Sequence, residues 1–297
     1  MTTATALTAD LLQEMPLPQP SADGDKDDRG RVLVIAGSAQ VPGGALLAGV
    51  AALRAGAGKL QIATAASVAP HLGLAVPEAL VIGLPEMPSG GIADGATDIL
   101  LQHARRCDAV LLGPGMMDEN AVAGLAIALL EGVEGPAFVL DAAALTRMLD
   151  FREPLRRHAG HAVVTPHAGE MASLLSVTRE EVIADAAGAA RKAVALLQAV
   201  VVLKGGVTYI VTPQGRAWVY SGGNVGLATS GSGDTLAGII AGLLARGATP
   251  LHAALWGVYL HGEAGNQLMK THGPVGFLAR ELLAEIPRIM AATRSDT

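Results

Sequence analysis

The segment GLATSGSGDTLAGIIAGLLA (residues 226–245) holds the residues of this chain best suited to phosphate chemistry. Gly231, Ser232 and Gly233 precede an apolar, helix-like run that begins near Asp234. Unpaired N–H groups at a helix start, with the helix dipole behind them, attract anions, and glycines leave the backbone open to a phosphate. A carboxylate beside such a turn can accept the proton of a hydroxyl that attacks phosphorus. The alternative interpretation makes Asp234 an ordinary helix N-cap and the glycines a tight turn.

A second candidate segment, KGGVT, follows the apolar run AVVVL directly. It consists of Lys204, Gly205, Gly206, Val207 and Thr208. A lysine at the carboxyl end of a buried strand is poorly placed for a core and well placed to bind a phosphate. The same glycines are also expected to open a β-hairpin, and both interpretations can hold together.

Three weaker segments also follow expected strands. TPHAGEM (165–171) places His167 after the run AVVT, although a lone histidine is more often structural. The glycines of GPG (113–115) allow either a ligand or another part of the chain to come close to the backbone. GSAQVPGGALLAG (37–49) precedes a helix and either binds an anion or turns the chain.

These segments must be positioned by alternating strands and helices. Strands are predicted at 31–37, 59–64, 79–84, 108–113, 137–141, 162–165 and 199–205, with a hairpin turning at 213–215. Helices are predicted at 44–57, 98–106, 120–130, 180–197, 234–246 and 251–269. Such alternation predicts an α/β fold with a mostly parallel central sheet and helices on both faces. Ligands in such folds bind beyond the carboxyl ends of the strands, where all five segments lie.

The composition excludes several classes of protein. The 297 residues are 51% apolar and 16% charged, unlike an intrinsically disordered chain. A net charge of −6 provides no basic face for nucleic acids. Cys107 is the single cysteine, so neither an intrachain disulfide nor a cysteine-based zinc cluster can form. The longest helix-like apolar stretch spans about ten residues, short of the ~20 that cross a bilayer, and we expect a cytoplasmic protein without a membrane partner.

The chain is expected to form one domain behind a tail. Residues 1–29 combine Thr, Pro and Asp and are predicted to form a flexible N-terminal tail. Residues 30–297 are predicted to form a single domain, because no linker interrupts the alternation. The P-loop motif G-x-x-x-x-G-K-[ST] is absent, and no G-x-G-x-x-G follows the first strand, which argues against P-loop NTPases and Rossmann dehydrogenases.

Taken together, the motifs resemble a known family. SGSGDTLAGIIAGLLA is similar to the G-[TS]-G-D anion-hole signature of ribokinase-like kinases. The segment from Ala36 to Thr64, with GPGM, TPHAGEM and KGGVT, resembles the ADP/ATP-dependent NAD(P)H-hydrate dehydratases. The likeness runs from about residue 31 to about residue 265. It implies a ribokinase-like fold and repair of hydrated NADH and NADPH. In that reaction ADP phosphorylates the hydroxyl of the S-hydrate, and loss of phosphate restores the dihydronicotinamide and leaves AMP.

The resemblance also implies roles for individual residues. Asp234 matches the catalytic aspartate and also contacts the hydrate, and the turn at 231–233 forms the anion hole. Ala45, Gly115 and His167 match positions that bind the hydrate. Lys204, Gly205, Gly206, Val207, Thr208 and Gly233 match positions around the nucleotide. Mg²⁺ is implied as a partner of the phosphates, with no ligand that can be assigned. The resemblance further implies a homo-oligomer, with a tetramer favoured.

The sequence departs from the family pattern at a few positions. The signature has GSGD in place of the commoner GTGD, and Ala143 stands where many relatives have a second aspartate, which leaves the role of Asp141 open. We expect no epimerase domain of the kind fused to some relatives. Two other functions remain as alternatives: a ribokinase-like kinase acting on a thiazole or pyrimidine alcohol, and a non-catalytic nucleotide sensor on the same fold.

Overall fold

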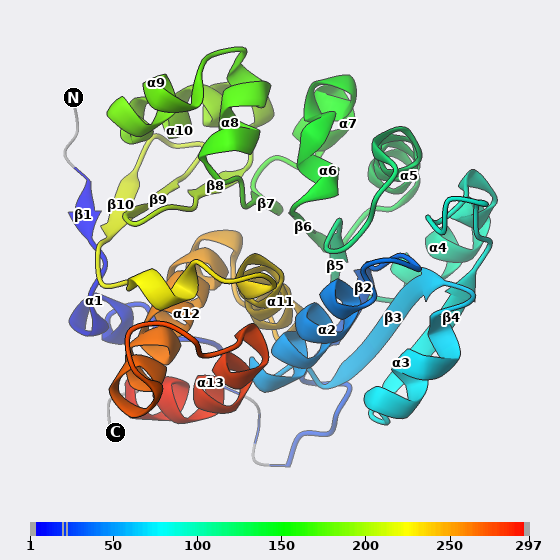
Figure 1. Ribbon diagram of the computed structural model, residues 1–297, viewed down its shortest axis with the longest axis horizontal. Coiled ribbons are helices and arrows are strands. Elements are labelled where there is room, and N and C mark those ends of the chain that lie inside the picture. The colour runs from blue at the N-terminus through cyan, green and yellow to red at the C-terminus, as the bar shows by residue number, and fades with distance from the viewer. Residues whose placement is uncertain (1–3, 20, 22, 294–297) are drawn as a thin grey trace.

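The computed structural model describes residues 4–19, 21 and 23–293, and within them ten strands form one sheet (Figure 1). The strand order is β1-β10-β9-β8-β7-β6-β5-β2-β3-β4. All neighbouring strands run parallel except β9, which is antiparallel to β8 and β10. The strands are β1 (Thr5–Ala6), β2 (Arg31–Ile35), β3 (Lys59–Ala65), β4 (Ala79–Leu84), β5 (Ala109–Leu112), β6 (Ala137–Leu140), β7 (Ala162–Val164), β8 (Val200–Leu203), β9 (Thr208–Val211) and β10 (Ala217–Tyr220). The predicted mostly parallel α/β sheet, including its hairpin, is confirmed.

Helices cover both faces of the sheet and bury two separate clusters of apolar side chains (Figure 1). One face carries α1 (Ala9–Gln13), α2 (Gly43–Arg54), α3 (Ala69–Ala75), α11 (Ser232–Ala245), α12 (Pro250–His272) and α13 (Ala279–Thr293). The other carries α4 (Thr97–Ala104), α5 (Glu119–Gly132), α6 (Ala143–Thr146), α7 (Arg152–Arg157), α8 (Ala168–Leu175), α9 (Arg179–Ala184) and α10 (Ala186–Leu197). Along β2 the side chains alternate between the two clusters, as the period of two in a strand requires. No helix in these described ranges is long and apolar enough to cross a membrane.

Helix α11 is buried along almost its whole length and packs closely against α2. An added Cβ at Gly238 would lie 2.2 Å from the Ala48 carbonyl oxygen, and one at Gly242 would lie 2.3 Å from that of Ala52. Since real Cβ atoms do not approach backbone oxygens so closely, both glycines are needed for this contact. The close packing fixes the N-terminus of α11 relative to the sheet.

The predicted helix at 180–197 is two helices. Helix α9 ends at Ala184 and α10 begins at Ala186, because the Asp185 carboxylate accepts a hydrogen bond from the Gly188 N–H at 2.9 Å and caps a new helix. Six helices in the described part of the chain have no counterpart among the predicted ranges: α1, α3, α6, α7, α8 and the C-terminal α13. Helix α13 buries Leu282, Leu283 and Ile286 on one face and carries a proline inside it.

The prediction of a flexible tail over residues 1–29 is wrong for the part that the structure describes; residues 1–3, 20 and 22 lie outside it. Strand β1 pairs with β10, and α1 packs against α12 and α13. Leu7, Leu12 and Leu17 are buried, and the Trp256 indole donates a hydrogen bond to the Met15 carbonyl at 2.8 Å. Composition missed this contact because only a few apolar side chains anchor the segment.

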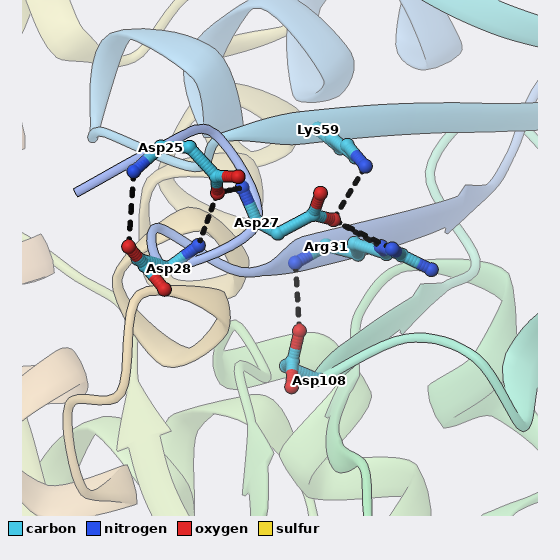
Figure 2. Close-up of polar contacts among 6 residues, drawn as sticks. All are labelled: Asp25, Asp27, Asp28, Arg31, Lys59 and Asp108. Atoms are coloured by element: carbon cyan, nitrogen blue, oxygen red, sulfur yellow. Dashed lines mark hydrogen bonds and ion pairs between the residues drawn. The ribbon is translucent and has the colours of Figure 1, made fainter.

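The loop before β2 is also attached, at the edge where the strands begin. Figure 2 shows Asp27 between Arg31, the first residue of β2, and Lys59, the first residue of β3. The Asp108 carboxylate accepts a hydrogen bond from the Arg31 backbone N–H at 2.7 Å. Lys59 and Arg31 hold the pKa of Asp27 down at about 2. This exposed cluster lies at the edge opposite the segments expected to do chemistry.

Candidate active site at the carboxyl edge of the sheet

The segments TPHAGEM and KGGVT lie side by side where β7 and β8 end. His167 and Lys204 form an isolated parallel bridge, and the Lys204 backbone N–H donates to the Pro166 carbonyl at 2.8 Å. This backbone pairing extends the sheet by one step beyond β7 and β8. It places the two side chains on the same rim, as the positions after the strands predicted.

The anion-hole turn has the backbone geometry of an open helix start. Gly231 has φ = +86° and is the N-cap of α11, with no side chain capping the helix. Ser232, Gly233 and Asp234 are the first three helical residues, and the first intrahelical hydrogen bond runs from Thr235 to the Gly231 carbonyl at 3.0 Å. The Ser232 N–H donates to the Thr229 carbonyl at 3.2 Å, whereas the N–H groups of Gly233 and Asp234 face the open end of the helix. The alternative in which Asp234 caps the helix is wrong.

Gly231 is required by its surroundings as well as by its backbone angle. An added Cβ there would lie 2.4 Å from a methyl carbon of Leu47 on α2. The positive φ is itself strained for any residue with a side chain. The turn is therefore wedged between α2 and the carboxyl edge of the sheet, which holds its N–H groups in place.

Asp234 is a carboxylate without a partner in the described part of the chain. Among those residues, it forms no hydrogen bond or ion pair. Burial and the nearby Asp141 carboxylate raise the pKa of Asp234 to about 6, while the Lys204 ammonium opposes them. Such a group is ionised at neutral pH, yet it is more basic than an ordinary aspartate. This combination suits a general base.

Lys204 reaches across the rim to Asp141. Its ammonium lies 2.6 Å from Asp141 Oδ1, and the lysine side chain is 19% exposed whereas the aspartate is 1% exposed. An added Cβ at Gly233 would lie 3.3 Å from Lys204 Nζ, so the ammonium faces the first turn of α11. Burial lowers the pKa of Lys204, but the Asp141 and Glu170 carboxylates outweigh burial and the pKa is raised. The cation is thus retained beside the anion-hole turn.

His167 caps α8 and has a defined tautomer. Its Nδ1 accepts hydrogen bonds from the backbone N–H groups of Gly169 and Glu170, at 2.9 and 3.1 Å. In return, the Glu170 carboxylate accepts from the His167 N–H at 2.8 Å, which completes a capping box. The ring proton therefore sits on Nε2, which lies 3.4 Å from Glu170 Oε1. The structural interpretation of His167 is confirmed, and its side chain is 59% exposed at the rim.

A cavity of about 760 Å³ brings many of these residues together. Its walls come from the ends of β7 and β8, the hairpin, the start of α11 and the middle of α12. The predicted residues in its lining are His167, Lys204, Gly205, Gly206, Thr208, Ser232 and Gly233. Asp234 follows Gly233 directly. Val207 lines a separate cavity of about 390 Å³ on the other side of the KGG turn. The volume suits a nucleotide-sized ligand.

Ala45 and Gly115 lie outside that cavity lining, in two loops packed against each other. An added Cβ at Gly44 would lie 2.8 Å from the Gly115 backbone nitrogen, and the Gly37 N–H donates to the Pro114 carbonyl at 2.7 Å. The Ala45 side chain is fully buried. Contact of Ala45 with a hydrate therefore requires its backbone N–H, in the first turn of α2. Binding of the hydrate by Ala45 and Gly115 remains a prediction.

Two polar contacts of the site were not predicted. Asp141 directly follows β6, and its Oδ1 accepts a second hydrogen bond, from the Thr165 hydroxyl at 2.6 Å. Ser232 Oγ and His261 Nε2 lie 2.9 Å apart, and burial lowers the pKa of His261 to about 4, so this ring is neutral. Asp141 could have been found from its position after a strand. His261 lies in the middle of α12, where the sequence gives no signal.

Comparisons with known proteins identify the family of this chain. The family model described as NAD(P)H-hydrate dehydratase matches residues 32–288. The ADP-dependent (S)-NAD(P)H-hydrate dehydratase of Xanthomonas campestris pv. campestris is 51% identical over 286 residues, which cover 96% of this chain and 95% of that protein. An ADP/ATP-dependent NAD(P)H-hydrate dehydratase of Bacillus subtilis, co-crystallised with ATP and Mg²⁺, matches with a TM-score of 0.83 and 31% identity, over 99% of this chain and 100% of that one. A hydroxyethylthiazole kinase of Pyrococcus horikoshii shares the fold, with a TM-score of 0.62, 20% identity and 89% coverage of both chains. The chain belongs to the NAD(P)H-hydrate dehydratase family.

Proposed function

We propose that this protein restores NADH and NADPH from their S-hydrates, with ADP as the phosphoryl donor. The observation that carries the proposal is the arrangement of Asp234 with the open turn before it and the Lys204 ammonium beside it. A base, an anion hole and a cation within one rim are the parts that phosphoryl transfer needs. The family to which the chain belongs supports the choice of substrate.

Asp234 accepts the proton of the hydrate hydroxyl as that oxygen attacks the terminal phosphorus of ADP. The bond from phosphorus to the oxygen bridging the two phosphates of ADP breaks, and AMP leaves. The anion-hole turn of Gly231, Ser232 and Gly233 and the Lys204 ammonium stabilise the charge on the transferring phosphoryl group. The phosphorylated hydrate then loses phosphate and a proton from the adjacent carbon. Because phosphate is a far better leaving group than hydroxide, a kinase-type site thus achieves a dehydration.

His167 and the glycine turns position the two ligands. The exposed His167 ring has its Nε2 atom 3.4 Å from Glu170 Oε1, and it donates the Nε2 proton to an oxygen of the hydrate when the hydrate binds. Lys204 to Thr208 and Gly233 contact the nucleotide, and Ala45 and Gly115 contact the hydrate through their backbones. The large cavity takes the nucleotide, since its lining includes the KGG turn and the start of α11.

Mg²⁺ fits this site as part of the nucleotide substrate. In the ranges that the structure covers, no group of three or more His, Cys, Asp or Glu side chains could hold a metal ion. The Asp141 carboxylate is already engaged by Lys204 and Thr165. Since Mg²⁺ commonly binds through phosphates and water with only one or two carboxylates, an ion carried in by ADP needs no preformed cage. When bound, it neutralises phosphate charge.

The test is incubation of the purified protein with S-NADHX and ADP, followed by absorbance of the reduced nicotinamide. We expect the absorbance to recover, with one AMP and one phosphate formed for each NADH. A stable phosphorylated product without recovery would indicate a small-molecule kinase instead. Binding of ADP with no turnover of any hydrate would indicate a nucleotide sensor. We further expect the protein to act as a cytoplasmic homo-oligomer, with a tetramer favoured, which sedimentation of the purified protein would check.

A further inference from the structure

The backbone around Asp141 is strained and tightly packed. It follows β6 directly, and the next residue, Ala142, has φ = +48°, a strained angle for a residue with a side chain. Gly113, at the end of the neighbouring strand, approaches so closely that an added Cβ would lie 1.8 Å from the Asp141 carbonyl oxygen. Backbone strain that the surroundings maintain is typical of functional sites.

Both observed contacts of Asp141 are made by the same oxygen. Lys204 Nζ and the Thr165 hydroxyl each lie 2.6 Å from Oδ1. The aspartate is 1% exposed. A buried ion pair gives little net stability, because desolvation offsets the attraction between the charges. Stability alone therefore does not account for a buried pair that is held by a strained turn.

We propose that Asp141 is a positioning residue, which anchors the Lys204 ammonium over the first turn of α11 and, with that ammonium, sets the charge around Asp234. The inference rests on the proposed function, in which Asp234 is the base and Lys204 meets the phosphate. Asp141 touches neither ligand in this arrangement. It acts through Lys204 by the ion pair and on Asp234 through the repulsion between two carboxylates.

The titratable groups around Asp234 come from four elements besides its own. The end of β6 provides Asp141, which raises the pKa of Asp234, and the end of β8 provides Lys204, which lowers it. The start of α8 provides Glu170 and the His167 ring, and Glu170 acts on Lys204. Helix α12 adds the His261 ring, which is neutral because burial lowers its pKa to about 4. Asp141 and Lys204 are thus the two groups whose removal changes Asp234 in opposite directions.

The experiment is a titration of the Asp234 carboxyl by carbon NMR on protein labelled with ¹³C at the aspartate carboxyls, with the signal assigned from Asp234→Asn. In Asp141→Asn we expect the midpoint to fall by about one pH unit, the lower end of the effect of a neighbouring carboxylate. In Lys204→Met we expect it to rise. A general loosening that exposes Asp234 would lower the midpoint in both variants, so the opposite signs identify the charges as the cause.

The kinetic readout is the pH dependence of kcat with S-NADHX and ADP. The acidic limb of the profile moves to lower pH in Asp141→Asn, and kcat on the plateau falls roughly tenfold because a weaker base transfers protons less efficiently. The control is Asp108→Asn, an exposed aspartate at the opposite edge of the sheet, which should leave both the titration and the profile unchanged.

If Asp141→Asn does not fold, the same comparison is made between Lys204→Met and the double variant Lys204→Met/Asp141→Asn. Removing both charges leaves no unpaired buried ion. We expect the double variant to titrate Asp234 lower than the single one. If removing Asp141 leaves the titration midpoint of Asp234 unchanged, both in the wild type and in Lys204→Met, the proposal is overturned. The NMR titration needs no turnover, so a protein inactive on S-NADHX would refute the proposed function while leaving this test decisive.

Discussion

Each edge of the sheet carries a lysine–aspartate pair, and the two pairs differ in nearly every other respect. At the carboxyl edge, Lys204 and Asp141 are 19% and 1% exposed and face the open start of α11. At the amino edge, Lys59 and Asp27 are 29% and 45% exposed and tie a surface loop to β2 and β3 (Figure 2). The same two residue types therefore lie beside the proposed phosphoryl-transfer site at one edge and attach a loop at the other. What separates them is burial and the helix terminus beside them.

The difference also reverses the behaviour of the nearby carboxyl groups. Asp27 lies between two cations in water, and its pKa falls to about 2. Asp234 is partly buried near another carboxylate, and its pKa rises to about 6. A depressed pKa makes a poor base, whereas a raised one makes a better base that is still ionised at neutral pH. The comparison explains why an aspartate at the carboxyl edge suits proton transfer.

The largest expected effect is that of Asp234→Asn on turnover. Loss of a general base costs about 10²–10⁴ in rate, and we expect kcat with S-NADHX and ADP to fall within that range. Asparagine keeps the size of the side chain, so ADP affinity measured by calorimetry should stay the same or rise slightly. Asp27→Asn is the matched control and should retain full kcat. An Asp234→Asn variant with more than about a tenth of the wild-type kcat would remove Asp234 from the role of base.

Replacing each lysine by methionine gives the next largest difference. Lys204→Met loses a charge-assisted contact with phosphate worth roughly 1.5–3 kcal/mol, or about 10- to 100-fold in ADP affinity. It also leaves Asp141 buried and unpaired, which destabilises the fold by about 3–5 kcal/mol. Lys59→Met is the control. It should change the ADP affinity and the free energy of unfolding only slightly, because exposed ion pairs contribute little to stability. Calorimetry with ADP and urea unfolding measure both quantities, and equal effects of the two substitutions would contradict the contrast between the edges.

The pH dependence of stability should differ in sign between the edges. Asp234 has a raised pKa in the folded state, so the native protein binds more protons than the unfolded chain between about pH 4 and 6. Its contribution to stability is therefore lost as pH rises through that window, by about 3 kcal/mol. Asp234→Asn should lack this loss and be more stable than the wild type at pH 8. Urea unfolding of both proteins at pH 4 and pH 8 would show it, and a constant difference between them would count against the raised pKa.

The smallest expected effect is that of the amino-edge cluster. Asp27 has a depressed pKa, so its contribution to stability is present above about pH 4 and is lost as pH falls toward 2. We expect Asp27→Asn to lower the melting temperature slightly at pH 7 and low salt, and to match the wild type at pH 2. Added salt should remove most of the difference at pH 7, because exposed charges are screened. A large effect that resists salt would show that the cluster contributes more than a surface ion pair.

The parts of the site that the sequence could predict are those encoded locally. The glycines at 231 and 233, followed by an apolar run, predict the start of α11 to within two residues. Lys204 was placed at the rim because it follows the apolar run that forms β8. Such patterns need no knowledge of which segments meet in space.

The remaining parts depend on contacts between distant segments. The partner of Lys204 lies 63 residues earlier in the chain, so neither residue alone shows that they form a pair. His261 meets Ser232 from the middle of α12, where nothing in the surrounding sequence marks it. The N-terminal segment is predicted to be a flexible tail because residues 1–29 combine Thr, Pro and Asp, although Leu7 and Leu12 are buried. Their burial depends on the surface that β10 and α12 provide.

The central claim of this account is that the hydroxyl of the hydrate leaves as phosphate. S-NADHX carrying ¹⁸O in that hydroxyl, turned over with unlabelled ADP, tests it directly. Because the hydroxyl oxygen attacks phosphorus and its bond to carbon then breaks, we expect one ¹⁸O atom in each phosphate released, seen as an isotope shift in the ³¹P NMR signal. Unlabelled phosphate, with the ¹⁸O recovered in water, would contradict the proposed use of Asp234 and the anion-hole turn.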